Sequence, residues 1–89
     1  MLPIISQFYG IIISMFFNDI DKHHKPHIHV QYGEFNCTFD FEGNILSGKI
    51  PNKQRKLVEA WIELRKDDLN VLWKIVQDGS GSFYIEPLK

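Results

Sequence analysis

Cysteine is almost missing from this chain, and its scarcity excludes several classes of protein. Only Cys37 occurs among the 89 residues, so no internal disulfide can staple the fold and no cysteine-rich zinc site can form. Neither a C-x-x-C nor an H-E-x-x-H motif is present, which removes the common zinc frameworks. Cys37 itself falls on the apolar side of a predicted strand, where we expect a small buried hydrophobe and not a nucleophile.

The chain also lacks a large excess of positive or of negative side chains. Ten lysines and arginines oppose eleven aspartates and glutamates, for a net charge of -1, which argues against non-specific binding to nucleic acid. The most apolar stretch, residues 11–17, is far shorter than the roughly 20 residues of a membrane helix. No basic stretch or small-residue cleavage site of a signal peptide accompanies it. We expect a cytoplasmic protein without membrane contact.

Repeats, linkers and low-complexity tracts are absent as well. With 44% hydrophobic and 13% aromatic residues, the chain can build one hydrophobic core, so residues 1–89 are predicted to form a single domain. The most concentrated feature that is present is histidine, the side chain best suited to bind metal or exchange protons near neutral pH. All four histidines lie within seven residues, at His23, His24, His27 and His29.

Two alternating segments around Gly33-Glu34 predict a β-hairpin. Residues 27–32 and residues 35–41 each alternate polar and apolar side chains, and glycine at the first loop position suits a type II′ turn. A two-residue loop fixes the pairing of the strands. The apolar face then pairs Tyr32 with Phe35, Val30 with Cys37 and Ile28 with Phe39. The opposite face pairs Gln31 with Asn36, His29 with Thr38 and His27 with Asp40, and we expect this polar face to be wet.

The remaining pattern predicts an α+β fold. Residues 8–17 read as one long strand with Tyr9 on its core face, and residues 45–50 as a short strand with Ser47 opposite Asp40. Turn residues then precede two helices and a final strand over 82–88. The order is β-β-β-β-α-α-β, a small antiparallel sheet with two helices packed on one face.

Capping residues and apolar spacing define the two predicted helices. Asn52 is the expected N-cap of the first and Asp67 of the second, which runs over 68–77 and ends before Gly79. A single bent helix is the alternative at Asp67-Asp68. The buried stripes are predicted to be Leu57, Val58, Trp61 and Leu64, followed by Leu69, Leu72, Trp73 and Val76.

At these residues the chain resembles a bacterial family, domain-of-unknown-function family 4160. That family opens with a Pro-x-Ile-x-x-Phe-Tyr-Gly-Ile-x-Ile-x-Met-like strand and continues to His-x-Pro-Pro-His-x-His-x-x-Tyr. Lys25 stands where the family usually has its first proline. The matching residues are Pro3, Ile4, Phe8, Tyr9, Gly10, Ile11, Ile13, Met15, His23, Pro26, His27, His29 and Tyr32.

The resemblance implies a small cytoplasmic protein that acts together with another. Genes of the family often lie beside those of domain-of-unknown-function family 2442, which implies a two-protein, toxin–antitoxin-like module that works by protein–protein binding. Surplus apolar side chains on the predicted first strand favour association with such a partner or with a second copy of the chain. The candidates for this surface are Phe8, Tyr9, Ile12, Phe16 and Phe17.

A metal site is one alternative. His27 and His29 lie two residues apart on one strand face, where two imidazoles can share Zn²⁺ or another divalent transition metal. His23, His24 or Asp19 from the preceding loop would add a third ligand. Asp40 would orient His27.

Acid–base chemistry is a second alternative, as in a metal-independent ribonuclease-type toxin. His27 would be the general base, Asp40 its orienting carboxylate, His29 or His23 the general acid, and Lys49 the phosphate clamp. A DNA-binding regulator has the least support, because Asp67-Asp68 places negative charge at the junction of the two predicted helices.

Overall fold

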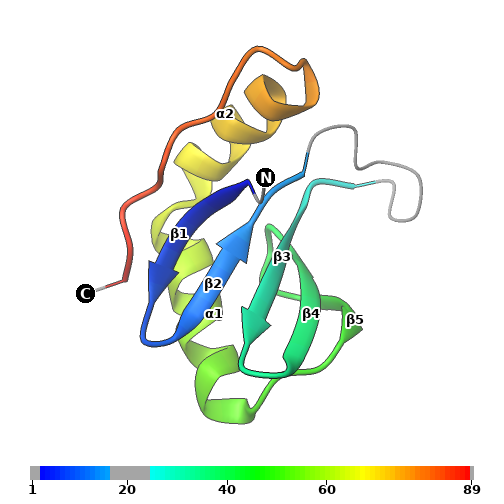
Figure 1. Ribbon diagram of the computed structural model, residues 1–89, viewed down its shortest axis with the longest axis vertical. Coiled ribbons are helices and arrows are strands. Elements are labelled where there is room, and N and C mark those ends of the chain that lie inside the picture. Colours follow the sequence, from blue (N-terminus) through cyan, green and yellow to red (C-terminus); the bar gives the residue numbers. More distant parts are fainter. Residues whose placement is uncertain (1–2, 17–24, 89) are drawn as a thin grey trace.

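The computed structural model describes residues 3–16 and 25–88 and has the α+β class that the sequence predicts (Figure 1). Five strands precede two helices, one strand more than predicted in that part of the chain. The strands are β1 Ile4–Phe8, β2 Ile11–Ser14, β3 His27–Tyr32, β4 Phe35–Asp40 and β5 Ile45–Gly48. The helices are α1 Asn52–Leu64 and α2 Lys66–Gln77.

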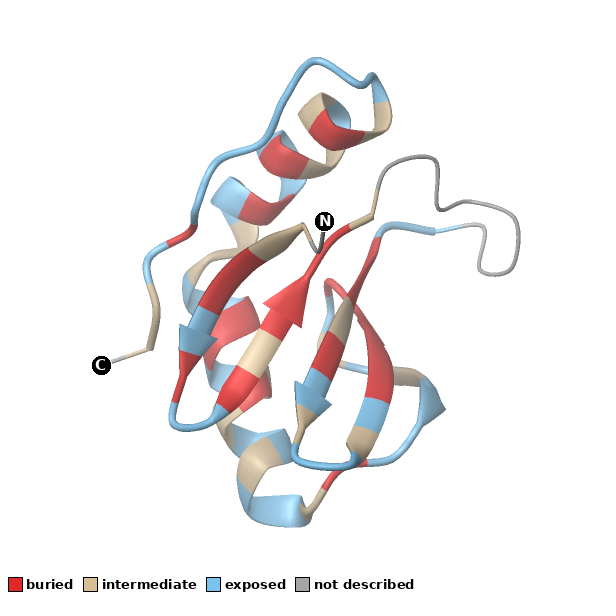
Figure 2. Ribbon diagram, in the orientation of Figure 1, coloured by how far each residue is buried: buried red, intermediate tan, exposed pale blue. Residues whose placement is uncertain are grey.

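The five strands form one antiparallel sheet in the order of the chain, β1-β2-β3-β4-β5. In Figure 1 both helices lie behind the sheet, and in the described part of the chain no helix covers its front face. The core lies between the two layers and is formed by apolar side chains of the strands and of both helices. Figure 2 shows buried positions, in red, on the sheet and on the helices. Its fully buried members include Ile11, Ile13, Ile28, Phe39, Trp61 and Leu69.

The predicted long strand over residues 8–17 is wrong, because the chain turns back at Tyr9-Gly10. Both residues have a positive φ, 49° and 79°, as a two-residue type I′ turn requires. Tyr9 is therefore 61% exposed at the turn and not in the core. Tyrosine favours strands and avoids positive φ, so the local pattern concealed this turn. Phe8, expected as surplus apolar surface, is buried beside Trp61, with ring centroids 5.6 Å apart.

The predicted hairpin and its register are confirmed. All six expected pairs of β3 and β4 occur, from His27 opposite Asp40 to Tyr32 opposite Phe35. Gly33 has a φ of 57°, which fits glycine at the first position of a type II′ loop. The two strands therefore carry the histidines on the face opposite Ile28, as alternation predicts.

The pairing of β5 differs from the prediction by an irregularity between Thr38 and Phe39. Ser47 lies opposite Thr38 and not opposite Asp40, while Gly48 lies opposite Cys37. Gly48 has a φ of 77°, and a Cβ placed there would lie 2.8 Å from the Cys37 Cα and closer still to the Asn36 carbonyl oxygen. Only glycine fits at this close approach of two backbones.

Two helices form, separated at Arg65, so the single bent helix is excluded. Neither predicted N-cap is confirmed: Pro51 and Arg65 occupy those positions, without a side-chain capping bond. Gly79 does end α2, because the Gly79 and Ser80 N–H groups donate to the Val76 and Ile75 carbonyls at 3.0 Å in a Schellman arrangement. None of the helices described has the length and apolar run that a membrane crossing needs.

The buried sides of the helices follow the predicted spacing with one exception. Val58 and Trp61 of α1 are buried, together with Leu69, Leu72 and Val76 of α2. Leu64 was predicted inward but is 65% exposed, because it is the last residue of α1, where the chain breaks before α2.

The predicted final strand over residues 82–88 is not formed, although this segment lies beside β1. The Ile85 N–H donates to the Ile5 carbonyl at 2.7 Å, and the Ser6 hydroxyl donates to the Ile85 carbonyl at 2.9 Å. The Trp61 indole N–H donates to the Glu86 carbonyl at 2.9 Å. One backbone bond and two side-chain bonds therefore hold a segment that the alternating pattern assigned to a backbone ladder.

Replacing Gly48 tests the close approach of β5 to β4. We expect Gly48→Ala to lower the free energy of unfolding by at least about 3 kcal/mol, through positive-φ strain and a clash that backbone atoms cannot relieve. Gly33→Ala is the matched control: it carries a similar φ strain of about 1 kcal/mol, but nothing lies within 4 Å of the added Cβ. Equal losses in urea unfolding of the two variants would contradict the packing proposed for Gly48.

Candidate functional site

The two described histidines lie together, but they differ in exposure. The rings of His27 and His29 have centroids 5.3 Å apart and meet at 67°. His27 is 2% exposed, whereas His29 is partly exposed on the front of the sheet. The predicted partners His23 and Asp19, and also His24, lie outside the described residues.

A series of rings continues from this pair toward α2. Phe16 packs against His29 with centroids 4.6 Å apart, and Trp73 of α2 lies 5.3 Å from the His27 ring. Phe41 meets Trp73 from the other side, at 6.2 Å. The expectation of a wet histidine face is therefore wrong at the His27 end, where the side chain is buried and its ring lies against Trp73.

The hydrogen bond of His27 fixes the position of its proton. Its Nδ1 lies 2.8 Å from the Lys25 carbonyl oxygen, and a carbonyl can only accept, so Nδ1 carries the hydrogen. In the neutral ring the lone pair is then on Nε2, the atom that could take a proton or a metal.

The carboxylate of Asp40 lies in the predicted strand position, but its oxygens bind other groups than the imidazole. Asp40 is 1% exposed. Its Oδ1 accepts from the Glu42 and Asn44 backbone N–H groups, each at 2.9 Å. Its Oδ2 accepts from the Asn44 side-chain amide at 3.2 Å and pairs with the Lys25 ammonium at 3.1 Å. The sequence analysis missed Asn44 and Lys25 as partners, although an aspartate before Gly43 is a known sign of an Asx-type turn.

Burial and hydrogen bonding act in opposite directions on Asp40. Burial raises the pKa of its carboxyl, but the Asn44 backbone, the Lys25 ammonium, the Asn44 side chain and the Glu42 backbone all favour the ionised form, and the pKa ends below its ordinary value. Asp40 is thus an ionised, fully hydrogen-bonded group that holds a turn.

Lys49 lies at the opposite end of the hairpin from His27. Its backbone N–H donates to the Asn36 carbonyl at 3.3 Å, and Asn36 pairs with Gln31, four residues along β3 from His27. At 3.3 Å per residue this separation is about 13 Å. The structure therefore does not bring together the set His27, Asp40 and Lys49 that the sequence suggested for phosphate chemistry.

The described residues also bear on the candidate metal site and on the Cys37 thiol. Among residues 3–16 and 25–88 no three histidine, cysteine, aspartate or glutamate side chains gather as a metal site would require. His27 and His29 are the two predicted ligands that the structure describes. Burial raises the pKa of the Cys37 thiol to about 11, so this residue stays protonated near neutral pH, as expected of a core cysteine.

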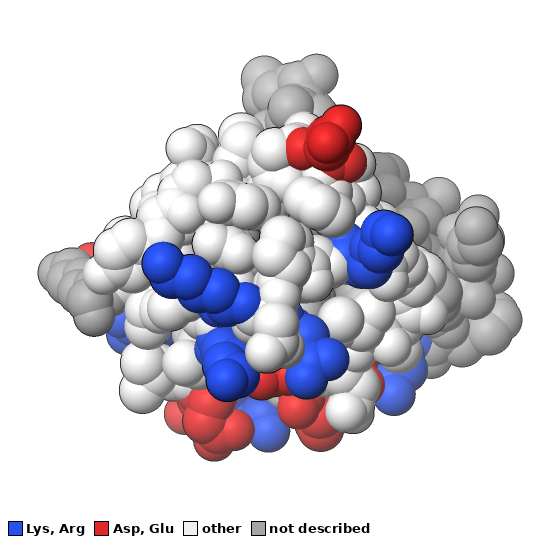
Figure 3. All heavy atoms as spheres, turned by 90° about the horizontal axis from the view of Figure 1, so that it is seen from below, with Lys and Arg blue, Asp and Glu red and all other residues white. Residues whose placement is uncertain are grey.

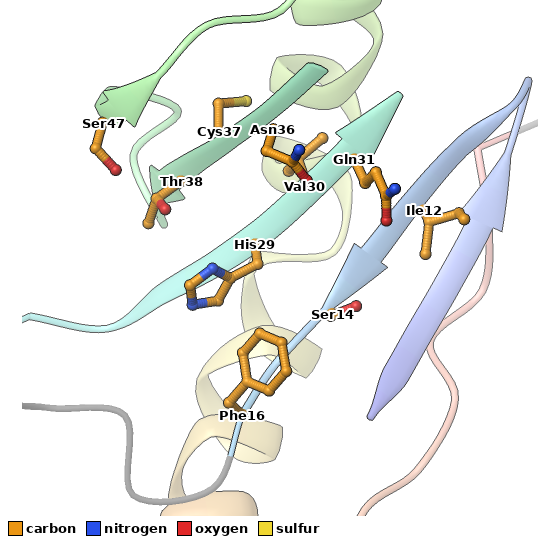
Figure 4. A pocket seen from close by; sticks show the side chains of 10 residues that line it. All are labelled: Ile12, Ser14, Phe16, His29, Val30, Gln31, Asn36, Cys37, Thr38 and Ser47. Atoms are coloured by element: carbon orange, nitrogen blue, oxygen red, sulfur yellow. The ribbon is translucent and has the colours of Figure 1, made fainter. Parts of the chain in front are cut away.

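A cavity of about 250 Å³ opens on the front of the sheet beside His29 (Figure 4). Figure 4 shows His29 and Phe16 together at one end and Gln31, Asn36 and Ile12 toward the other. Ten of the described residues line it, and none of these ten is a lysine, arginine, aspartate or glutamate. The strands present polar but uncharged groups here.

A second, larger hollow of about 590 Å³ lies where the β1–β2 turn meets the start of α1. The sequence analysis named Tyr9 as a surface candidate but placed Leu57 in a buried helix stripe, and it did not connect either residue with Tyr32, Gln54 or Leu88. Together these five residues come from four separate segments of the chain. We call this surface the turn-end groove; it is lined by Tyr9, Tyr32, Lys53, Gln54, Leu57 and Leu88.

Comparison with family models gives one result. Residues 10–74 match the model of domain of unknown function 4160, or DUF4160. The chain belongs to this family. The match spans strands β2 to β5, all of α1 and most of α2, and so includes the DUF4160 histidine motif on which the resemblance was based. Neither a curated protein nor a solved structure gives a significant match to the chain.

Replacing Asp40 tests its role in the turn. We expect Asp40→Asn to lower the free energy of unfolding at pH 7 by about 2 kcal/mol, because the variant loses hydrogen bonds to a charged acceptor. The folded-state pKa lies below the unfolded value, near 4 for aspartate. The stabilisation is therefore present above about pH 4 and is lost as the pH falls through the folded-state pKa.

Denaturant unfolding of both proteins between pH 7 and pH 2 measures this. Glu34→Gln, an exposed carboxylate of the same hairpin, is the matched control and should change stability little at any pH. A difference between wild type and Asp40→Asn that stayed constant down to pH 2 would show that the charge of Asp40 is not the source of the stabilisation.

Proposed function

We propose that the protein is a cytoplasmic binding module that docks a small partner protein in the turn-end groove, as one component of a two-protein, toxin–antitoxin-like pair. The observation that carries the proposal is Tyr9. This residue lines the groove and is 61% exposed, and its backbone has a φ of 49°, the one positive value at a non-glycine among the described residues.

Such a conformation costs a non-glycine residue about 1–2 kcal/mol, and strained positions cluster at binding and catalytic sites. Tyrosine is also among the residues that most often dominate protein–protein interfaces. A strained turn that presents an exposed tyrosine next to an apolar hollow therefore supports partner binding more directly than any other feature described.

The charge around the groove indicates the kind of partner. Lys53 lines the hollow, and the first turn of α1 contains no acidic residue. Figure 3 shows the same end of the molecule from below, with lysine and arginine side chains gathered near its centre. The positive end of the helix dipole adds to their field. We infer a partner segment that carries apolar side chains next to carboxylates.

The ribonuclease alternative has less support. The Asp40 carboxylate binds Lys25 and the 42–44 turn, Lys49 lies away from His27, and the cavity beside His29 has no lysine or arginine in its lining. Phosphoryl chemistry without a metal depends on such cations. A binding function needs none of these contacts.

Co-expression with the neighbouring gene product, expected from domain-of-unknown-function family 2442, tests the proposal. We expect the two proteins to co-elute from a size-exclusion column at micromolar concentration. Two stable proteins that elute separately would overturn the proposed pairing.

Variants of the groove then locate the contact. We expect Tyr9→Asn to weaken binding about tenfold or more while raising the free energy of unfolding by about 1 kcal/mol, because asparagine tolerates positive φ better than tyrosine. Lys53→Glu should weaken binding through charge reversal. The matched controls are Val71→Asn and Lys74→Glu on the exposed side of α2, which should leave the affinity unchanged. If Tyr9→Asn gained stability and still bound normally, the groove would not be the docking site.

A further inference from the structure

A row of four polar side chains crosses the front of the sheet, away from the turn-end groove. Ser14 of β2 lies opposite His29 of β3, His29 lies opposite Thr38 of β4, and Thr38 lies opposite Ser47 of β5. Neighbouring strands are about 4.8 Å apart, so the row is roughly 14 Å long. The cavity beside His29 lies along this row (Figure 4).

Most of the polar groups around this cavity have unused hydrogen-bonding capacity. Within residues 3–16 and 25–88, the side chains of five lining residues make no hydrogen bond. In the same part of the chain no side-chain oxygen or nitrogen is both fully buried and without a partner, so the polar atoms of these five side chains are accessible from outside. Ser14 and Thr38 are only 9% and 6% exposed, so the part of each hydroxyl that remains accessible faces the cavity. The five residues are Ser14, Gln31, Asn36, Thr38 and Ser47.

Enclosing polar groups without a protein partner is costly unless water or a ligand satisfies them. In most sheets the positions facing a core or a helix are apolar, and isolated hydroxyls on an exposed face point into bulk water. Here Ser14 and Thr38, each buried to nine-tenths or more, line one hollow together with two carboxamide side chains. The arrangement therefore favours a bound molecule that supplies several hydrogen bonds at once.

One side of the cavity is apolar. Ile12 and Phe16 line it, and the Phe16 ring meets His29 edge to face, at 4.6 Å and 76°. Phe16 is held in place by α2, because the Gln77 side-chain amide donates to its carbonyl at 2.7 Å. The Gln77 side chain and the His29 ring therefore both contact the residue that forms much of the apolar wall.

The absence of charge in the lining narrows the ligand class. A phosphate or carboxylate would call for a lysine or arginine, and an ammonium ion for an aspartate or glutamate, yet within residues 3–16 and 25–88 none of these lines the cavity. Hydroxyl and carboxamide groups both donate and accept, so their best partners are groups that do the same. Alcohol groups have this property. The apolar side chains on one side of the cavity would contact the C–H groups of a molecule that carries several alcohol groups.

We propose that this cavity binds a neutral polyhydroxylated molecule of about the size of a monosaccharide. The volume of about 250 Å³ corresponds to roughly eight water molecules, at about 30 Å³ each. Hydroxyls of the ligand pair with Ser14, Thr38 and Ser47 along the row and with the Gln31 and Asn36 amides beside it. The C–H face of the ligand lies on Ile12 and Phe16. The proposal is independent of the turn-end groove and of its partner.

Amide NMR titration of the whole protein tests this with D-glucose, D-galactose, D-ribose and myo-inositol as probes. At least one should give saturable shifts at Ser14, Thr38 and Ser47, with a dissociation constant in the millimolar range that suits a small polar ligand. Glucose 6-phosphate and glucuronate, of similar shape but charged, should bind more weakly than the neutral probe. Tighter binding of either charged compound would overturn the assignment, as would the absence of saturable shifts with all four neutral probes.

Two substitutions separate ligand contacts from effects on folding. Thr38→Val keeps the shape of the side chain and removes the hydroxyl, and Ser47→Ala lies on the exposed strand β5, where loss of a hydroxyl does not threaten the core. Each should weaken binding about three- to tenfold, the effect of one lost hydrogen bond. Ser80→Ala, an exposed serine beyond α2, is the control and should change nothing. Unaltered affinity in both Thr38→Val and Ser47→Ala would refute the site.

Discussion

The buried carboxylate of Asp40 is the interaction on which the arrangement of the last three strands depends. It accepts from the backbone of the 42–44 turn and pairs with Lys25, which lies just before β3. One charged group thereby fixes the start of β3, the end of β4 and the path into β5. Since β5 has only four residues, its own ladder is short, and the position of Ser47 in the polar row follows from this turn.

Two surfaces of opposite chemistry result from the same small sheet. The front face presents hydroxyls and carboxamides without charge around a cavity, whereas the turn-end groove combines an exposed tyrosine, apolar side chains and Lys53. The first is built on the middle of the strands, where the backbone is rigid. The second is built where the β1–β2 turn meets α1. Because the two surfaces share no lining residue, substitutions in one are expected to leave the other intact.

The sequence predicted best what depends on neighbouring residues. The alternation of polar and apolar residues, together with the turn at Gly33, was sufficient to predict how β3 pairs with β4. Both signals depend only on residues that are close together in the sequence. The turn at Tyr9 could not be predicted in this way, since a strand-forming residue is held at positive φ by pairing across the sheet. The predicted position of Asp40 opposite His27 was correct. The groups that bind the Asp40 carboxylate, however, lie in loops, and the alternation of polar and apolar residues does not determine the conformation of a loop. The polar row was hidden for a related reason, as it combines residues from four strands.

The bond between Ile85 and Ile5 has a consequence for how the protein is made. The outer edge of β1 is covered by residues 82–88, and the Ser6–Ile85 bond spans 79 positions of the chain. Synthesis at about 5–20 residues per second places roughly 4–16 s between the synthesis of β1 and that of its cover. Until the cover is made, the nascent β1–β2 hairpin exposes an unpaired edge that could add a strand from another molecule. Chaperone dependence of folding in the cell should therefore be concentrated at the first strand, whose cover is translated 79 positions later.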